Sequence, residues 1–487
     1  MLKLLYNTKE KGVICYMNIL VIGNGFDLAH ELPTKYTDFL FFCKIVLEII
    51  KENHIEIPEN KVDYIKWIKE SDKNFQLKAD ITSQFVCNEC AEEITERDKK
   101  AYKDIFYKYF IQNFLNENYD SELIKEIFYL VYDNFWIEYF GQCDMHGDEN
   151  WIDFESEISE LIQSLDEDMH GLSYVHNIED IVSDLSNSFL KEMYSDYIDA
   201  VQPINPIING FFGVTFKEIR NKLLNDLNRL IRAFEIYLTD YVEKIDCKLI
   251  SPDIQRILPK ESAKINRIPV YDTYVLSFNY TNTYQRLYIN KVQENKYFEN
   301  YIDYIHGKAD SNNTVDTNNM VLGIDEYLGK KKRNKHVEFI AFKKYYQRIY
   351  KETGCKYKDW INVIREENNI YMERKHDCEI YLENIEVLDN IKEEMRVKLK
   401  QLNENPPRHN LYIFGHSLDV TDKDILRNLI LNDNVHTTIF YYNKDTMGQQ
   451  IANLVKVIGQ DELIRRTGGS TKTIEFKLQQ DMIPAIN

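Results

Sequence analysis

The segment Ile19–Asp27 constrains the fold of this chain more than any other. It reads Ile-Leu-Val-Ile-Gly-Asn-Gly-Phe-Asp, an apolar run that breaks at two glycines and leads into a helix-like stretch beginning near Leu28. This strand–turn–helix pattern is typical of nucleotide-binding α/β proteins, where glycines let the backbone approach a phosphate and the helix N-terminus attracts an anion. Phe26 and Asp27 follow Gly25, so the longer dinucleotide fingerprint GxGxxG is absent, and a tight turn without a ligand is the alternative interpretation.

The composition describes a folded globular protein with a negative net charge. Of its 487 residues, 44% are hydrophobic and 29% are charged. No run reaches the roughly 18 uncharged apolar residues of a membrane span. Asp and Glu outnumber Lys and Arg by 79 to 60, and the net charge of −19 opposes general binding to nucleic acid or anionic lipid. The basic run Lys330–Arg333 is expected to be a solvated loop.

The cysteines point to a reduced, cytoplasmic setting. All eight are scattered along the chain, and no secretion signal precedes them. Cys87 and Cys90 form one CxxC pair, whereas a structural zinc site normally needs a second pair. We therefore expect no metal. Residues 1–16 have no features of a targeting peptide.

Residues 40 to about 250 are predicted to be mostly helical, because they contain few glycines or prolines and repeat apolar side chains at helical spacing. Two amphipathic helices are predicted within them, one over Trp151–Leu165 and one over 215–245. A loop between the two is predicted at Pro203, Pro206 and Gly210. The aromatic side chains of these helices are expected to form core rather than a stacking surface for bases, because the helical period already accounts for them.

Four further apolar runs are predicted to be strands, and polar residues or glycine follow each of them. The four runs are Tyr274–Phe278, Tyr301–Ile305, Asn410–Phe414 and Thr437–Tyr442. A helix at about 423–432 precedes the last strand, and Thr421-Asp422-Lys423-Asp424 has the form of a capping box for it. Strands that alternate with helices predict a parallel sheet, in which ligands bind at the carboxyl ends of the strands. The predicted fold class is α/β, a Rossmann-like parallel sheet with large α-helical insertions.

The chain is predicted to return to this sheet after each of two helical insertions. The Rossmann-like domain would comprise residues 1–45, 265–330 and 406–487, and the insertions residues 46–264 and 331–405. A polar cluster directly follows each of four predicted strands, at the carboxyl end where loops contact ligands in such folds. The clusters are Gly23-Asn24-Gly25, Asn279-Tyr280-Thr281-Asn282, His306-Gly307-Lys308 and Gly415-His416-Ser417-Leu418-Asp419. Each has a structural alternative, such as turn formation by Asn279 or helix capping by Ser417 and Asp419.

Together these blocks resemble the AbiH family of bacteriophage abortive-infection proteins. The resemblance rests on Gly23–His30 with Leu32-Pro33-Thr34 and Tyr36, on Ser277–Thr281, on His306-Gly307 and on Phe414–Asp419. It extends from Met17 nearly to the end of the chain. More distantly, the same blocks resemble the SIR2-like fold of many defence NADases.

The SIR2-like resemblance implies that Asn279 and His306 are catalytic and that NAD is the substrate. The residues that it implies for binding the dinucleotide are Gly23, Asn24, Gly25, Phe26, Asp27, Gly415, His416, Ser417 and Asp419. The sequence departs from that pattern at Asn24, Asp27 and Thr281. An acidic Asp27 beside a pyrophosphate would weaken binding unless it capped the helix or faced the ribose hydroxyls. A homo-oligomer and a phage-derived trigger are further expectations from the resemblance.

The implied reaction is hydrolysis of NAD, or of a related nucleotide, at the N-glycosidic bond. His306 is the natural base, because an imidazole with an unperturbed pKa of about 6.5 can accept a proton at cytosolic pH. Asn279 would hold the ribose hydroxyls or the attacking water.

Two alternative functions stay open. One is a nuclease-type toxic effector with Asp325, Glu326, Asp419 and Asp422 as metal ligands. The other is a nucleotide-binding sensor that signals without catalysis.

Overall fold

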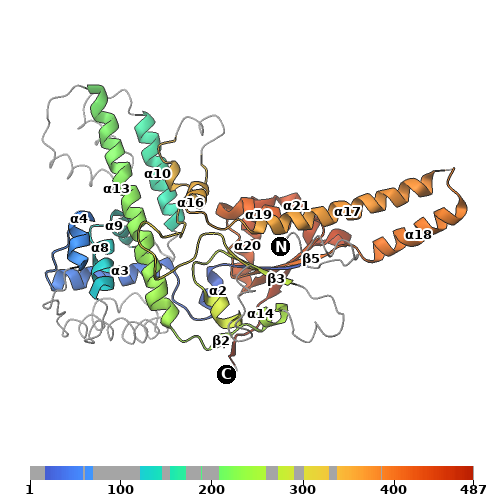
Figure 1. Cartoon of the computed structure of the whole chain (residues 1–487), viewed down its shortest axis with the longest axis horizontal. Helices are drawn as coiled ribbons and strands as arrows, with labels where there is room; N and C mark the ends of the chain where they lie inside the picture. Colours follow the sequence, from blue (N-terminus) through green and yellow to red (C-terminus); the bar gives the residue numbers. More distant parts are fainter. Residues whose placement is uncertain are drawn as a thin grey trace. The chain divides into compact units, whose positions relative to one another are not determined.

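The computed structural model divides the chain into two compact units, each assembled from segments that are distant in the sequence (Figure 1). The structure describes residues 17–58, 61–69, 121–144, 154–171, 188, 208–258, 272–289, 301–327, 337–384 and 386–485. The first unit comprises Met1–Leu32, Cys247–His306 and Gly354–Asn487, and the second comprises Pro33–Asp246 and Gly307–Thr353. The domain boundaries expected from the sequence stay predictions.

A parallel sheet forms the centre of the first unit. Within the described residues it has six strands in the order β4-β3-β1-β5-β6-β7, and all neighbouring strands are parallel. The strands are β1 (Met17–Ile22), β3 (Asp272–Ser277), β4 (Ile302–Tyr304), β5 (His409–Phe414), β6 (Val435–Tyr441) and β7 (Ile474–Leu478). In this register Ile19 lies opposite Tyr274 of β3 and Leu411 of β5. The predicted α/β fold and the predicted strands are confirmed, whereas β7 was not predicted.

Strand β1 is buried on both faces. Met17, Ile19 and Val21 pack into one apolar cluster, and Leu20 and Ile22 pack into another. Successive side chains of a strand point to opposite faces, so the continuous apolar run of β1 supplies the core on both sides of the sheet.

Helices cover this sheet, and a hairpin of two helices extends from it (Figure 1). The helices of the first unit are α2 (Asn24–Ala29), α14 (Pro252–Ile257), α17 (Tyr357–Glu383), α18 (Asp389–Glu404), α19 (Lys423–Ile430), α20 (Lys444–Ile458) and α21 (Gln460–Thr467). Shorter turns are η5 (Gln285–Ile289), η8 (Val420–Asp422) and η9 (Gly469–Thr471). The short strands β2 (Leu249–Ile250) and β8 (Ile483–Pro484) pair antiparallel. Helices α17 and α18 form the hairpin.

Two local predictions in this unit were wrong. The first helix begins at Asn24 rather than near Leu28, so Gly25 lies inside it. The expected capping box at Thr421–Asp424 does not form, because the 3-10 turn η8 precedes α19. Asp419 caps that turn instead, with its Oδ1 accepting from the N–H of Thr421 at 2.9 Å.

The second unit is helical in its described residues. Its elements are α3 (Tyr36–Glu52), α4 (Lys61–Lys69), α8 (Ser121–Val131), α9 (Phe135–Asp144), α10 (Phe154–Gly171), α13 (Ile208–Ile236), η2 (Tyr237–Tyr241), η3 (Val242–Lys244), η7 (Ile340–Phe342) and α16 (Lys344–Tyr350). The apolar side chains predicted to face the core are buried, from Phe154 to Leu165 in α10 and from Leu223 to Tyr241 in α13 and η2. Gly210 lies in α13 rather than in a loop. Trp151, Pro203 and Pro206 lie outside the described residues.

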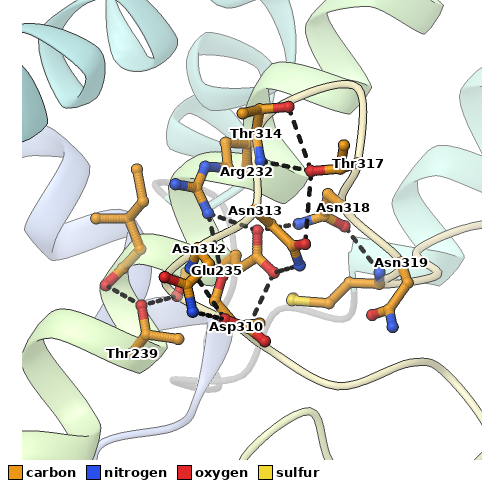
Figure 2. A network of polar contacts seen from close by, with 12 residues as sticks. Arg232, Glu235, Thr239, Asp310, Asn312, Asn313, Thr314, Thr317, Asn318 and Asn319 are labelled. Atoms are coloured by element: carbon orange, nitrogen blue, oxygen red, sulfur yellow. Dashed lines mark hydrogen bonds and ion pairs between the residues drawn. The ribbon is translucent and has the colours of Figure 1, made fainter.

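A buried carboxylate on α13 holds a long loop in the second unit (Figure 2). Glu235 is fully buried. One of its oxygens accepts from the backbone N–H of Asp310 at 3.0 Å and from Asn313 Nδ2 at 2.7 Å. The other accepts from Arg232 Nη1 at 2.7 Å and from Asn318 Nδ2 at 2.5 Å. Four donors therefore satisfy this carboxylate and order the loop that begins at Gly307.

Candidate functional site

The carboxyl ends of β4, β3, β1 and β5 lie along one edge of the sheet. The chain places β3 and β4 on one side of β1 and then β5 on the other, so the strand order reverses between β1 and β5. Such a reversal is where open α/β sheets bind ligands. Hydrogen bonds keep the strand ends aligned, from Phe278 N to Ile22 O and from Ile305 N to Ser277 O, both at 2.9 Å.

The glycine turn after β1 packs tightly against the loop after β5. The N–H of Gly25 donates to Gly415 O at 2.8 Å, and the N–H of Gly23 donates to Phe414 O at 3.3 Å. A Cβ on Gly25 would lie 2.8 Å from Gly415 Cα. At Gly415, where φ is +67°, a Cβ would lie 2.1 Å from Phe26 N. Close approach of two backbones therefore accounts for these glycines, and their predicted role in dinucleotide binding stays a prediction.

Three buried side chains form a His–Asp–His cluster at this edge. His306 Nε2 lies 3.4 Å from Asp422 Oδ1, and His416 Nε2 lies 3.4 Å from Asp422 Oδ2. The side chains of His306, Asp422 and His416 are 6%, 10% and 4% exposed. The cluster thus joins the loops that follow β4 and β5 to the turn before α19.

The backbone around His416 determines which of its ring nitrogens carries the proton. The N–H of Leu418 donates to His416 Nδ1 at 2.9 Å, so Nδ1 is an acceptor. The proton of the neutral ring is then on Nε2, which faces Asp422. Leu418 is buried and has a φ of +61°, a backbone conformation that residues other than glycine rarely adopt. Strained backbone of this kind is concentrated at functional sites.

Phe278 forms an apolar wall for both imidazoles. Its ring lies 5.5 Å from that of His306 and 4.3 Å from that of His416, in edge-on geometry. Tyr280 adds a second, tilted ring 6.4 Å from His306. The residues that follow β3 therefore place two aromatic rings beside the cluster.

Asn279 belongs to a second polar group at the same edge, centred on Asp27. Asp27 is 1% exposed. Its Oδ2 accepts from Asn279 Nδ2 at 3.1 Å and from Thr281 Oγ1 at 2.7 Å. Thr283 Oγ1 donates to Thr281 Oγ1 at 3.1 Å. Asp27 therefore faces side chains that follow β3.

The sequence model described as bacteriophage abortive infection AbiH matches residues 19–443. The chain belongs to the AbiH family. The match covers the glycine turn, the His–Asp–His cluster and the polar group around Asp27, and the family has a role in bacteriophage abortive infection. No curated protein and no protein of known structure matches the chain. None of the described helices has the length and apolar character that a membrane crossing requires.

A buried histidine supports the glycine turn of this AbiH protein. His30 Nδ1 donates to Phe26 O at 2.7 Å, and Tyr288 lies with its hydroxyl 2.9 Å from His30 Nε2. The same hydroxyl accepts from Ser251 N at 2.7 Å, and it donates to Nε2, because the proton of the neutral ring is on Nδ1. Burial lowers the pKa of His30 to about 4, the bond to Phe26 opposes this, and the charge of Arg286 lowers it further. The ring is therefore neutral at pH 7.

The remaining predicted residues lie elsewhere or have structural partners. Ser417 is exposed, and its carbonyl accepts from Asn453 Nδ2 at 2.9 Å. Asp325 and Glu326 belong to the second unit, where Glu326 pairs with Lys343 at 2.7 Å. Among the described residues, no group of three or more His, Cys, Asp or Glu side chains can hold a metal ion. Cys87, Cys90 and Lys330–Arg333 lie outside the described residues.

Asp422 is the member of the cluster that the sequence did not place with His306 and His416. It was expected to cap a helix or, in the nuclease alternative, to bind a metal. The available signal was its position six residues after His416, in the segment that follows β5.

Proposed function

We propose that this AbiH family member acts against phage by hydrolysing NAD, or a related nucleotide, at the N-glycosidic bond of its nicotinamide ribose. The observation that carries the proposal is the buried cluster of His306, Asp422 and His416, at the edge of a Rossmann-like sheet where the loop after β3 also carries Asn279. Buried imidazoles held by a carboxylate suit proton transfer near neutral pH. The distant resemblance to SIR2-like NADases supports the same reaction.

The bond to be broken joins C1′ of the ribose to the positively charged ring nitrogen of nicotinamide. Its electron pair leaves with the ring, so nicotinamide departs as a neutral molecule and no general acid is needed. The ribose develops oxocarbenium character, and water attacks C1′. One proton of that water must be removed, and the products are nicotinamide and ADP-ribose.

His306 is the proposed base for this water. Asp422 faces Nε2 of His306, so the Nε2 proton of the neutral ring points to the carboxylate and the lone pair is on Nδ1. A carboxylate in this position orients an imidazole and stabilises the imidazolium that forms when it takes a proton. His416 approaches the other oxygen of Asp422 and fixes the carboxylate from the opposite side. Asp422 and His416 are thus positioning residues, whereas His306 is catalytic.

The experiment that tests this function compares infected cells that carry the wild-type protein, His306→Ala or His376→Ala. His376 is an exposed histidine on α17 and serves as the matched control. We expect cellular NAD to fall after infection and phage yield to drop with the wild type and His376→Ala, and neither to change with His306→Ala. Protection without loss of NAD would contradict the proposal. Degraded nucleic acid would then favour the nuclease alternative, and NAD binding without turnover would favour the sensor.

A further inference from the structure

The carboxylate of Asp27 is aimed at Asn279 rather than at solvent. Asp27 lies in α2, and a carboxylate can only accept hydrogen bonds. The group that faces Asp27 Oδ2, at 3.1 Å, must therefore be the amide nitrogen of Asn279. The oxygen and the nitrogen of an amide have nearly the same shape, and the contact with the carboxylate determines which of the two faces Asp27.

The backbone of Asn279 is fixed as well. Ser277 Oγ donates to the carbonyl of Asn279 at 3.0 Å and lies 3.2 Å from its N–H. Thr281 donates its hydroxyl proton to the same oxygen of Asp27 and accepts from Thr283. This chain of hydroxyls gives the Thr281 hydroxyl a defined direction, so Asn279 and Thr281 are both held in place as donors to Asp27.

We propose that Asp27 is a positioning residue that presents the amide oxygen of Asn279 to the substrate. With the nitrogen committed to Asp27, the oxygen Oδ1 is the part of the amide that a ligand meets, and it makes no hydrogen bond within the described part of the chain. An oxygen acceptor recognises a hydroxyl donor. Asn279 therefore selects substrates with a free hydroxyl on the nicotinamide ribose. This inference rests on the proposed function, and it gives Asp27 a role other than contact with a pyrophosphate.

The test is a double-mutant cycle in NAD binding, measured by calorimetry on full-length protein that also carries His306→Ala, so that NAD is not consumed. The cycle measures the effect of Asp27→Asn on NAD binding twice, once with Asn279 present and once in the Asn279→Ala background. An asparagine at position 27 offers both a donor and an acceptor, so the amide of Asn279 can rotate. We expect Asp27→Asn to weaken NAD binding at least tenfold when Asn279 is present and less than twofold when it is absent.

Asp253→Asn is the matched control, because Asp253 is a buried aspartate of the same unit that accepts from the N–H of Gln480 at 2.8 Å and pairs with Arg256 and Lys477 rather than with Asn279. We expect it to leave NAD binding unchanged, and thermal melting of each variant verifies folding. Equal weakening by Asp27→Asn in both backgrounds, or no weakening in a folded variant, would overturn the inference. Nicotinamide release by the wild type separates the outcomes: release with no effect of Asp27→Asn refutes only the role of Asp27, whereas neither release nor binding refutes the proposed function with it.

Discussion

Glu235 in the second unit and Asp422 in the first are both buried carboxylates, and their surroundings differ. Four donors approach the oxygens of Glu235 at 2.5–3.0 Å. Two imidazoles face Asp422, each at 3.4 Å, which is beyond the usual length of a hydrogen bond of about 2.7–3.2 Å. A fully satisfied network orders a structure, whereas catalytic contacts are often long until the substrate binds. We therefore propose a structural role for Glu235 and a role in proton transfer for Asp422.

The largest expected effect is on the Glu235 network. Glu235→Ala removes the acceptor of buried Asn318 and of half-buried Asn313 and one of the acceptors of buried Arg232, and breaking a buried ion pair costs about 3–5 kcal/mol. Urea denaturation measures the loss. The matched control is Glu393→Ala, which removes an exposed partner of Arg396 at 2.8 Å and should cost less than about 0.5 kcal/mol. Equal losses in the two variants would remove the distinction between a network and an ordinary pair.

The next largest effect is expected from substituting Gly415, a glycine beside the site. Gly415→Ala places a Cβ 2.1 Å from Phe26 N at a φ of +67°, and we expect it to lower the free energy of unfolding by about 3 kcal/mol or more. Gly448→Ala is the control, because Gly448 lies in α20 with nothing within 4 Å of its Cβ position. That variant should gain about 0.5–1 kcal/mol from helix propensity. If Gly415→Ala is as stable as the wild type, the two loops do not need their close approach.

Lowering the pH should destabilise the first unit, because His30 takes up a proton when the unit unfolds. Its pKa is about 4 in the folded protein against 6.5 when unperturbed, so the unfolded state binds more protons between these pH values. Stability therefore falls as the pH falls from 6.5 to 4, by about 3 kcal/mol in total, and is fully present above pH 6.5. Denaturation at several pH values measures the slope. His30→Gln cannot titrate and should reduce the slope, and an unchanged slope would contradict the assignment.

The smallest of these effects concerns Asp422. Asp422→Asn keeps the shape of the side chain but removes the charge that orients His306, and we expect about a 10- to 100-fold loss of NAD turnover with the fold intact. Nicotinamide release and a thermal melt measure both quantities. A large loss of stability with normal turnover would place Asp422 in the same class as Glu235.

Strong periodic signals made most of the fold predictable. The apolar run of β1 and the helical spacing of Leu223, Leu227 and Leu230 could each form only one kind of buried element. Strand β7 was not predicted, because Glu475 and Lys477 interrupt its short apolar run at the edge of the sheet. The sequence also gave no sign that Gly25 packs on Gly415, because local pattern does not show which backbone approaches a turn.

The candidate site was predicted only in part. Asn279, His306 and His416 were expected because they follow predicted strands, and the structure brings them to one edge of the sheet. Asp422 and the contacts of Asp27 depend on pairings across more than 100 residues of sequence, as between Asp27 and Asn279 and between His306 and Asp422. Only the folded chain reveals such pairings, and Asp422 also fitted a local capping pattern.

We propose above that the His306–Asp422–His416 cluster hydrolyses NAD. The most direct test of this proposal is nicotinamide release from NAD by the purified full-length protein, with and without extract from phage-infected cells, beside His306→Ala. We expect equal release of nicotinamide and ADP-ribose by the wild type and at least a 100-fold lower rate for the variant, because a general base contributes about 10²–10⁴-fold. NAD left intact by the wild type under both conditions, or cleaved equally by His306→Ala, would contradict the account.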